Sequence, residues 1–228
     1  MTVAGKGPVV VFESGLGETR ANWDKVAPAL SRCFTVVTYA RPGIGESGAR
    51  QDPEAPVLEA EVADALLAAL RARRLSGPYL PIGHSLGGLY VQAFARNHPA
   101  DVAGIVLVDA ASPLEPLGVF VSTAPPKHGT IEDAEEAGAA PTMGALQAGA
   151  PLPRVPFIVS AATSHADTPE REALWQEVQK KTAALSPHGK RIVMDSGHFV
   201  QTDKPHAVID AVIDVASEAG WDVSGCRR

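Results

Sequence analysis

The chain has few of the features that mark disulfide-rich, membrane-spanning or secreted proteins. Its 228 residues include only 2 cysteines, Cys33 and Cys226, and 5% of the residues are aromatic. Two cysteines are too few for a disulfide framework, so they are consistent with a reducing compartment. No apolar run reaches the length of a membrane span, and no basic and apolar signal pattern opens the chain. We therefore expect a cytoplasmic protein.

The chain also lacks an excess of positive charge. Its formal net charge is -6, which argues against a nucleic-acid partner because phosphates would be repelled. The one local basic cluster, at Arg71, Arg73 and Arg74, falls at the end of an expected helix, where cations suit the helix dipole. The hydrophobic fraction of 45% and the charged fraction of 20% are those of an ordinary globular protein.

Short apolar runs alternate with amphipathic segments along the chain. The alternation predicts an α/β fold, with an open, mostly parallel sheet of about six strands covered by helices on both faces. The expected strands are residues 8–12, 33–39, 77–82, 102–108, 156–160 and 190–194, and the expected helices are residues 23–30, 57–75, 86–97, 168–185 and 205–219. The length fits a single domain spanning residues 1–228.

Residues 111–153 break this alternation. The segment is rich in Pro, Ala and Gly and shows no strong hydrophobic period. A long irregular segment inside a compact domain is usually functional. We therefore expect a lid-like insertion over the site.

The segment Gly83-His-Ser85-Leu-Gly87 joins an expected strand to an expected helix. It matches G-x-S-x-G, the nucleophile elbow, in which flanking glycines allow a sharp turn and the strained serine projects its hydroxyl outward. Ser85 could instead be a simple helix N-cap, but capping requires neither glycine. Ser85 is therefore our candidate nucleophile.

A serine nucleophile needs a base and a carboxylate that orients the base. His198 follows the last expected strand and is the candidate base, whereas we interpret His84 as structural and His165 as a turn or surface residue. Asp109, directly after a buried strand, and Asp167, in a looser turn, compete as the acid. We prefer Asp109 because the acid must be held rigidly.

Two backbone N–H groups would complete such a site as an oxyanion hole. Leu86 directly follows the nucleophile, and Leu16 lies in the glycine-rich loop after the first expected strand. The G-x-G-x-x-G pattern at residues 43–48 opens no helix, so we discount a dinucleotide site. No cluster has the sequence spacing of metal ligands, and we expect no metal and no cofactor.

Taken together, these motifs resemble the alpha/beta-hydrolase superfamily over residues 8–218. They are Glu13-Ser-Gly-Leu-Gly17, Tyr39-Ala-Arg-Pro-Gly-Ile-Gly-Glu-Ser47, Gly83-His-Ser-Leu-Gly-Gly88, Leu107-Val-Asp109 and Ser196-Gly-His198. The chain departs from the family at Glu13-Ser14, where many members have His-Gly, and at Ala40, where an Asp often stands. No clear Gly-x-x-Asp follows the strand at Phe157, and Asp109 matches an alternative acid position. The short N-terminal segment leaves little room for the usual hairpin.

The resemblance implies a serine hydrolase that acts on small or medium carboxylic esters through an acyl-enzyme on Ser85. Other readings of the same triad are a hydroxynitrile lyase, a cofactor-free perhydrolase and a non-catalytic small-molecule receptor. Product analysis and multiple turnover would separate these alternatives.

Overall fold

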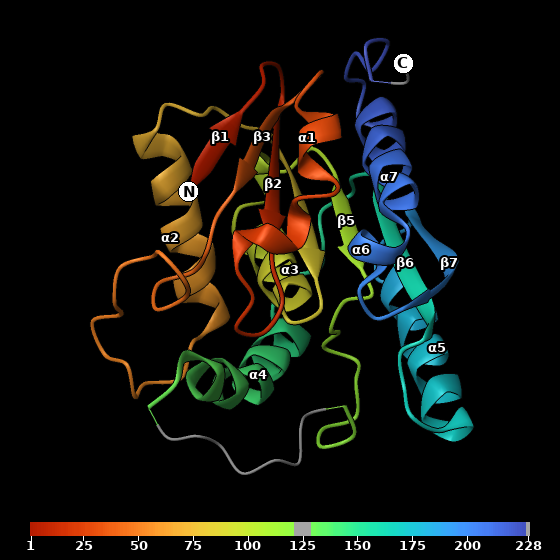
Figure 1. Cartoon of the computed structure of the whole chain (residues 1–228). Helices are drawn as coiled ribbons and strands as arrows, with labels where there is room; N and C mark the ends of the chain where they lie inside the picture. Colours follow the sequence, from red (N-terminus) through yellow and green to blue (C-terminus); the bar gives the residue numbers. More distant parts are fainter. Residues whose placement is uncertain (121–128, 227–228) are drawn as a thin grey trace.

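The computed structural model describes residues 1–120 and 129–226, which form one sheet covered by helices on both faces (Figure 1). The seven strands lie in the order β1-β3-β2-β4-β5-β6-β7. They are β1 (Thr2–Ala4), β2 (Val9–Glu13), β3 (Thr35–Thr38), β4 (Tyr79–His84), β5 (Ile105–Val108), β6 (Phe157–Ser164) and β7 (Gly189–Gly197). The α/β fold and the six expected strands are confirmed.

The strand β1 is the addition to the expected sheet. It pairs with β3 and is antiparallel, whereas every pairing from β3 to β7 is parallel. All three of its residues are exposed, so it lacks the apolar run that identified the other strands. Because β3 separates β1 from β2, these two strands form no hairpin with each other.

The parallel strands are buried on both faces because helices cover each side. Val9 and Val11 of β2 pack in the core layer that includes residues of α2 (Glu59–Ala72), α3 (Gly87–Asn97) and α5 (Pro169–Ala183). Val10 and Phe12 point the other way, into the layer formed with α1 (Ala27–Leu30) and α7 (Pro205–Glu218). The described residues also form three short helices, η1 (Arg20–Trp23), η2 (Pro99–Asp101) and α6 (Val200–Asp203).

The insertion differs from the irregular segment expected at residues 111–153. Residues Ile131–Ala148 form an 18-residue helix, α4, which lies beyond the carboxyl ends of the central strands, at the bottom of Figure 1. Thr130 caps this helix by accepting a hydrogen bond from Asp133 N. Its many alanines favour a helix but give little hydrophobic period, which hid it from pattern analysis. Residues 121–128 of the insertion lie outside the described residues.

The two cysteines form a disulfide between Cys33, just before β3, and Cys226, after α7. The bond joins positions 193 residues apart, and only the fold shows that their Cα atoms lie 5.6 Å from each other. The expectation of a reducing compartment depended on unpaired cysteines, and the disulfide removes that basis. Over the described residues, none of the helices is long and apolar enough to cross a bilayer.

Candidate active site

Ser85 lies in a strained turn between β4 and α3. Its φ of +50° falls in the left-handed region, which residues with a Cβ rarely adopt. A Cβ on Gly83 would lie 2.7 Å from Gly87 O, and a Cβ on Gly87 would lie 2.5 Å from Ser14 O. Both glycines are therefore needed for the close backbone approach, as the motif predicted. The turn places Ser85 at the carboxyl edge of the sheet.

Asp109 follows β5, the neighbour of β4, and its side chain is fully buried. Its Oδ1 accepts hydrogen bonds from Ala162 N at 2.9 Å and from Trp175 Nε1 at 2.7 Å. Its Oδ2 lies 2.7 Å from Nδ1 of both His165 and His198. Burial opposes ionisation, but the hydrogen bonds from the two histidines hold the pKa of Asp109 well below its usual value. Asp109 is therefore a carboxylate held by four partners.

His198 directly follows β7, and its imidazole contacts Asp109. Its ring also lies 4.6 Å, centroid to centroid, from the ring of His84, the residue before Ser85. The structure thus brings the candidate base and the preferred acid together at the edge where Ser85 lies. The competing acid, Asp167, lies elsewhere, since its carboxylate is 69% exposed and pairs with Arg171 Nη1 at 2.6 Å.

His165 was missed as a site residue. It directly follows β6, and its ring stacks on the Trp175 indole with centroids 3.6 Å apart and planes 7° apart. Its Nδ1 lies 3.1 Å from Nδ1 of His198. The interpretation as a turn or surface residue was therefore wrong. The signal that could have identified it is its position, since Asp109, His165 and His198 each directly follow a parallel strand.

These same three residues lie close enough together to be candidate metal ligands, and the expectation of no metal stays a prediction. One ligand atom each from Asp109, His165 and His198 lies within 4.8 Å of the others. The residues are 33 to 89 positions apart, so no local sequence spacing reveals the cluster.

Two backbone N–H groups of the loop between β2 and η1 are held by carboxylates. Gly15 N donates to Glu18 Oε2 and Gly17 N donates to Glu135 Oε2, both at 2.8 Å. Among the described residues, the N–H groups of Leu16 and Leu86 donate to no protein acceptor. These are the two donors that the sequence analysis proposed for an oxyanion hole. The carboxylates of Glu18 and Glu135 bond the N–H groups on either side of Leu16 and so fix the conformation of its loop.

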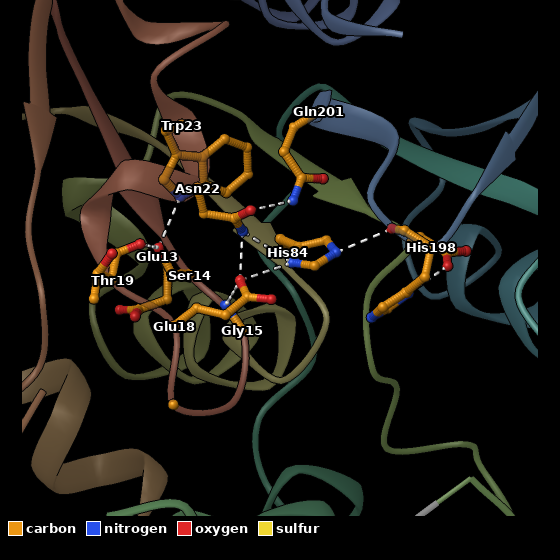
Figure 2. Close-up of polar contacts among 12 residues, drawn as sticks. Glu13, Ser14, Gly15, Glu18, Thr19, Asn22, Trp23, His84, His198 and Gln201 are labelled. Atoms are coloured by element: carbon orange, nitrogen blue, oxygen red, sulfur yellow. Dashed lines mark hydrogen bonds and ion pairs between the residues drawn. The ribbon is translucent and has the colours of Figure 1, made fainter. Parts of the chain in front are cut away.

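A buried network links this loop to the segment that carries His198 (Figure 2). His84 is fully buried, and its Nε2 donates to the backbone oxygen of His198 at 3.0 Å. Its Nδ1 lies 3.1 Å from Glu18 Oε2 and 3.2 Å from Asn22 Nδ2. Gln201 donates to Asn22 Oδ1 and closes the network. The structural interpretation of His84 agrees with these contacts, which connect the loop to the base.

On the other side of the loop, Arg41 forms a second buried network. Its guanidinium is 3% exposed and pairs with Glu13 Oε1 at 2.6 Å and with Glu135 Oε1 at 2.5 Å. It also donates to the backbone oxygens of Ser14 and Gly15, at 2.7 and 2.6 Å. Burial raises the pKa of Glu13, and the two carboxylates raise the pKa of Arg41 despite its burial. Arg41 thereby links Glu135 of α4 to the backbone carbonyls of Ser14 and Gly15.

A cavity of about 810 Å³ lies beside this second network, next to α2 and residues 39–57. Arg41 and Glu135 are among its lining residues, but Ser85, Asp109 and His198 are not. The cavity is therefore adjacent to the charged network and distinct from the catalytic candidates.

Comparisons with known proteins agree with this architecture. A family model described as the alpha/beta hydrolase fold matches residues 8–203. An uncharacterised protein of Bacillus subtilis, YqjL, is 28% identical over 217 residues, which cover 92% of this chain and 83% of that protein. Pyrrolizixenacetamide deacetylase of Xenorhabdus hominickii is 37% identical over 109 residues, which are 47% of this chain but only 40% of the deacetylase.

Solved structures share the fold at low sequence identity. An esterase of Thermogutta terrifontis superposes with a TM-score of 0.80 and 19% identity, covering 96% of this chain and 92% of the esterase. The enol-lactonase of Burkholderia xenovorans superposes with a TM-score of 0.68 and 20% identity, covering 95% of each chain.

Proposed function

Because the chain belongs to the alpha/beta-hydrolase fold family, we propose that it is a serine hydrolase that cleaves small-molecule carboxylic esters. Ser85 is the nucleophile, His198 the general base, and Asp109 the acid that orients His198. The observation that carries the proposal is the 2.7 Å contact between His198 Nδ1 and Asp109 Oδ2 at the sheet edge where the strained Ser85 turn lies.

In the proposed reaction, His198 Nε2 removes the Ser85 hydroxyl proton as Oγ attacks the ester carbonyl carbon. The oxygen of the tetrahedral intermediate accepts hydrogen bonds from the N–H groups of Leu16 and Leu86. The intermediate collapses, and the alcohol leaves with the proton that His198 holds. Water, activated by His198, then attacks the acyl-enzyme and releases the carboxylic acid.

Asp109 acts through His198. By accepting from Nδ1–H it leaves Nε2 free to take the Ser85 proton, and it stabilises the imidazolium that forms. The hydrogen bonds to its Oδ1 from Ala162 N and Trp175 Nε1 fix the carboxylate in the orientation that this role requires. We assign the choice of acyl and alcohol groups to the lid-like segment 111–153, whose helix α4 contributes Glu135 to the oxyanion loop.

The test is turnover of p-nitrophenyl esters of graded acyl length, with a matching acetamide and carbamate in the same panel. Ser85→Ala should lower kcat by a factor of about 10⁶, as loss of a serine nucleophile does elsewhere. Ser31→Ala, which removes a hydroxyl bonded to Pro28 O outside the site, is the matched control. Unchanged ester turnover in Ser85→Ala would refute the proposal.

Product analysis separates hydrolysis from the rival reactions. Equal amounts of carboxylic acid and alcohol are expected, whereas release of cyanide from a hydroxynitrile or formation of a peracid would indicate a lyase or a perhydrolase. A fluorophosphonate probe should label Ser85 once per chain. Labelling without multiple turnover would favour the receptor.

A further inference from the structure

Three potential metal ligands converge at the carboxyl edge of the sheet, the edge at which the Ser85 turn also lies. The pairwise distances among Asp109 Oδ2, His165 Nδ1 and His198 Nδ1 are 2.7, 2.7 and 3.1 Å. Two imidazole nitrogens and one carboxylate oxygen form a donor set that suits zinc. Ligand atoms around tetrahedral zinc lie about 3.3 Å apart for bonds of about 2.0–2.1 Å. The two histidine nitrogens would therefore need to move apart by about 0.2 Å, and each would need to move about 0.6 Å from Asp109 Oδ2.

No placement of the imidazole protons gives both histidines a good hydrogen bond to Asp109 Oδ2. If both imidazoles carry a proton on Nδ1, two hydrogens crowd against one carboxylate oxygen, because the two nitrogens are 3.1 Å apart. If one Nδ1 is bare, its lone pair faces the anionic Oδ2 at 2.7 Å. A divalent cation at the centre accepts a lone pair from each of the three atoms and removes both conflicts.

The surroundings hold the ligands as a metal site requires. Asp109 Oδ1 is already bonded to Trp175 Nε1 and Ala162 N, so Oδ2 is directed toward the histidines. The His165 ring is fixed by its stack on Trp175. Such outer contacts orient ligands and strengthen metal binding. The side chains of His165 and His198 are 13% and 28% exposed, which allows an ion to reach them.

We propose that Asp109 Oδ2, His165 Nδ1 and His198 Nδ1 form a reversible Zn²⁺ site, with water as the fourth ligand. Zinc takes the lone pair of a neutral imidazole, so the ring proton of His198 must move from Nδ1 to Nε2. A ring protonated on Nε2 cannot accept the Ser85 proton. Zinc is therefore an inhibitor of the proposed hydrolase. Only this inhibitory consequence depends on the proposed function, and the binding itself does not.

The direct test is binding of Zn²⁺ to the full-length, tag-free chain, measured by competition with a chromophoric chelator, and the visible spectrum of Co²⁺ bound in its place. We expect one ion per chain and a tetrahedral cobalt spectrum. His165→Gln should weaken binding by at least about 10-fold, since second-sphere changes alone cost 10- to 100-fold. The control His206→Gln removes an exposed histidine on α7 and should bind as the original does.

Two further variants separate the two proposals. Ser85→Ala keeps all three ligands and should bind zinc normally although it lacks the proposed nucleophile. His198→Gln should weaken zinc binding as His165→Gln does. Melting curves confirm that each variant is folded. In the ester assay, zinc should inhibit the original chain, the chelator EDTA should reverse this, and His165→Gln should need more zinc for half inhibition.

Absence of stoichiometric binding to the folded chain would overturn the site. So would binding that is equally tight in His165→Gln and His198→Gln. If the original chain and Ser85→Ala both bind zinc but the original chain hydrolyses no ester, the proposed function fails and the metal site stands.

Discussion

Asp109 and Arg41 are two buried charges with opposite surroundings. Asp109 is an anion surrounded by an indole, a backbone amide and two imidazoles. Within residues 1–120 and 129–226, no arginine or lysine is among its hydrogen-bond partners. Arg41 is a cation paired with two buried carboxylates and two backbone carbonyls. Imidazoles can gain or lose a proton near neutral pH, whereas a guanidinium cannot. The first centre is suited to moving a proton and the second to holding backbone in place.

The largest expected effect comes from removing the charge of the first centre. Asp109→Asn should lower kcat for a p-nitrophenyl ester by about 10⁴-fold, because the amide no longer selects the reactive tautomer of His198. Asp167→Asn, on an exposed residue paired with Arg171, is the matched control and should change kcat by less than about 2-fold. A greater loss of kcat in Asp167→Asn than in Asp109→Asn would show that Asp167 is the acid that orients His198.

Substitution of Arg41, the second centre, should mainly change the stability of the fold. Arg41→Met leaves Glu13 and Glu135 buried without their cation, and should lower the free energy of unfolding by about 3–5 kcal/mol. Urea denaturation followed by circular dichroism measures this. Arg71→Met, in a pair where the arginine side chain is 62% exposed, should cost no more than about 1 kcal/mol. Equal losses in the two variants would mean that the Arg41 network contributes no more than a surface ion pair.

Glu135→Gln tests whether the second centre acts on the first. The carboxylate accepts from Gly17 N, next to the proposed oxyanion donor Leu16, and Gln would also place an amide against Arg41. We expect kcat to fall about 10- to 100-fold with a smaller change in KM. A misplaced Leu16 N–H stabilises the transition state less well, and it affects binding of the ground-state substrate less. Glu136→Gln, the next residue of α4, is the control. A change in KM alone would place Glu135 in substrate binding.

The smallest effect is expected at Glu115, whose pKa burial raises to about 7, with the charge of Asp109 adding to the increase. An acid whose folded-state pKa lies above its unfolded value of 4.5 binds its proton more tightly in the folded state. The protein should therefore lose stability as the pH rises from about 4.5 to about 7. Glu115→Gln should remove that loss, which we expect to be about 1–2 kcal/mol after screening.

Denaturation of both chains at about pH 5 and about pH 8 measures the difference. Glu54→Gln, on an exposed carboxylate, is the control and should follow the original chain at both pH values. An identical pH dependence in Glu115→Gln and the original chain would contradict the prediction.

The parts of the fold that were predictable carry their signal locally. Parallel strands buried on both faces appear as continuous apolar runs, as in residues 8–12, so the central sheet could be read directly. The exposed strand Thr2–Ala4 and the alanine-rich helix Ile131–Ala148 carry little hydrophobic contrast, and both were missed. The disulfide of Cys33 was missed because two cysteines were taken as too few for a disulfide framework, and only the fold shows that Cys226 lies within bonding distance.

The candidate site likewise contains residues that the sequence indicates and residues that it does not. The proximity of Asp109 and His198 could be predicted because parallel strands deliver their carboxyl ends to one edge of the sheet, whereas Ser85 was proposed from its G-x-S-x-G turn. His165 obeys the same rule, but no known motif drew attention to it. The pairing of Arg41 with Glu135 joins residues 94 positions apart and follows no motif, so nothing local indicates it.

By itself, the sequence determined the class of sheet and the serine turn, because glycines at positions 83 and 87 and the apolar strands encode local backbone geometry. Only the tertiary structure decided which acid meets His198, that a second histidine shares that acid, and that α4 and Arg41 hold the loop of Leu16. The physical reason is that hydrogen bonds and ion pairs depend on distances of about 3 Å between side chains, and chain folding sets those distances between residues remote in sequence.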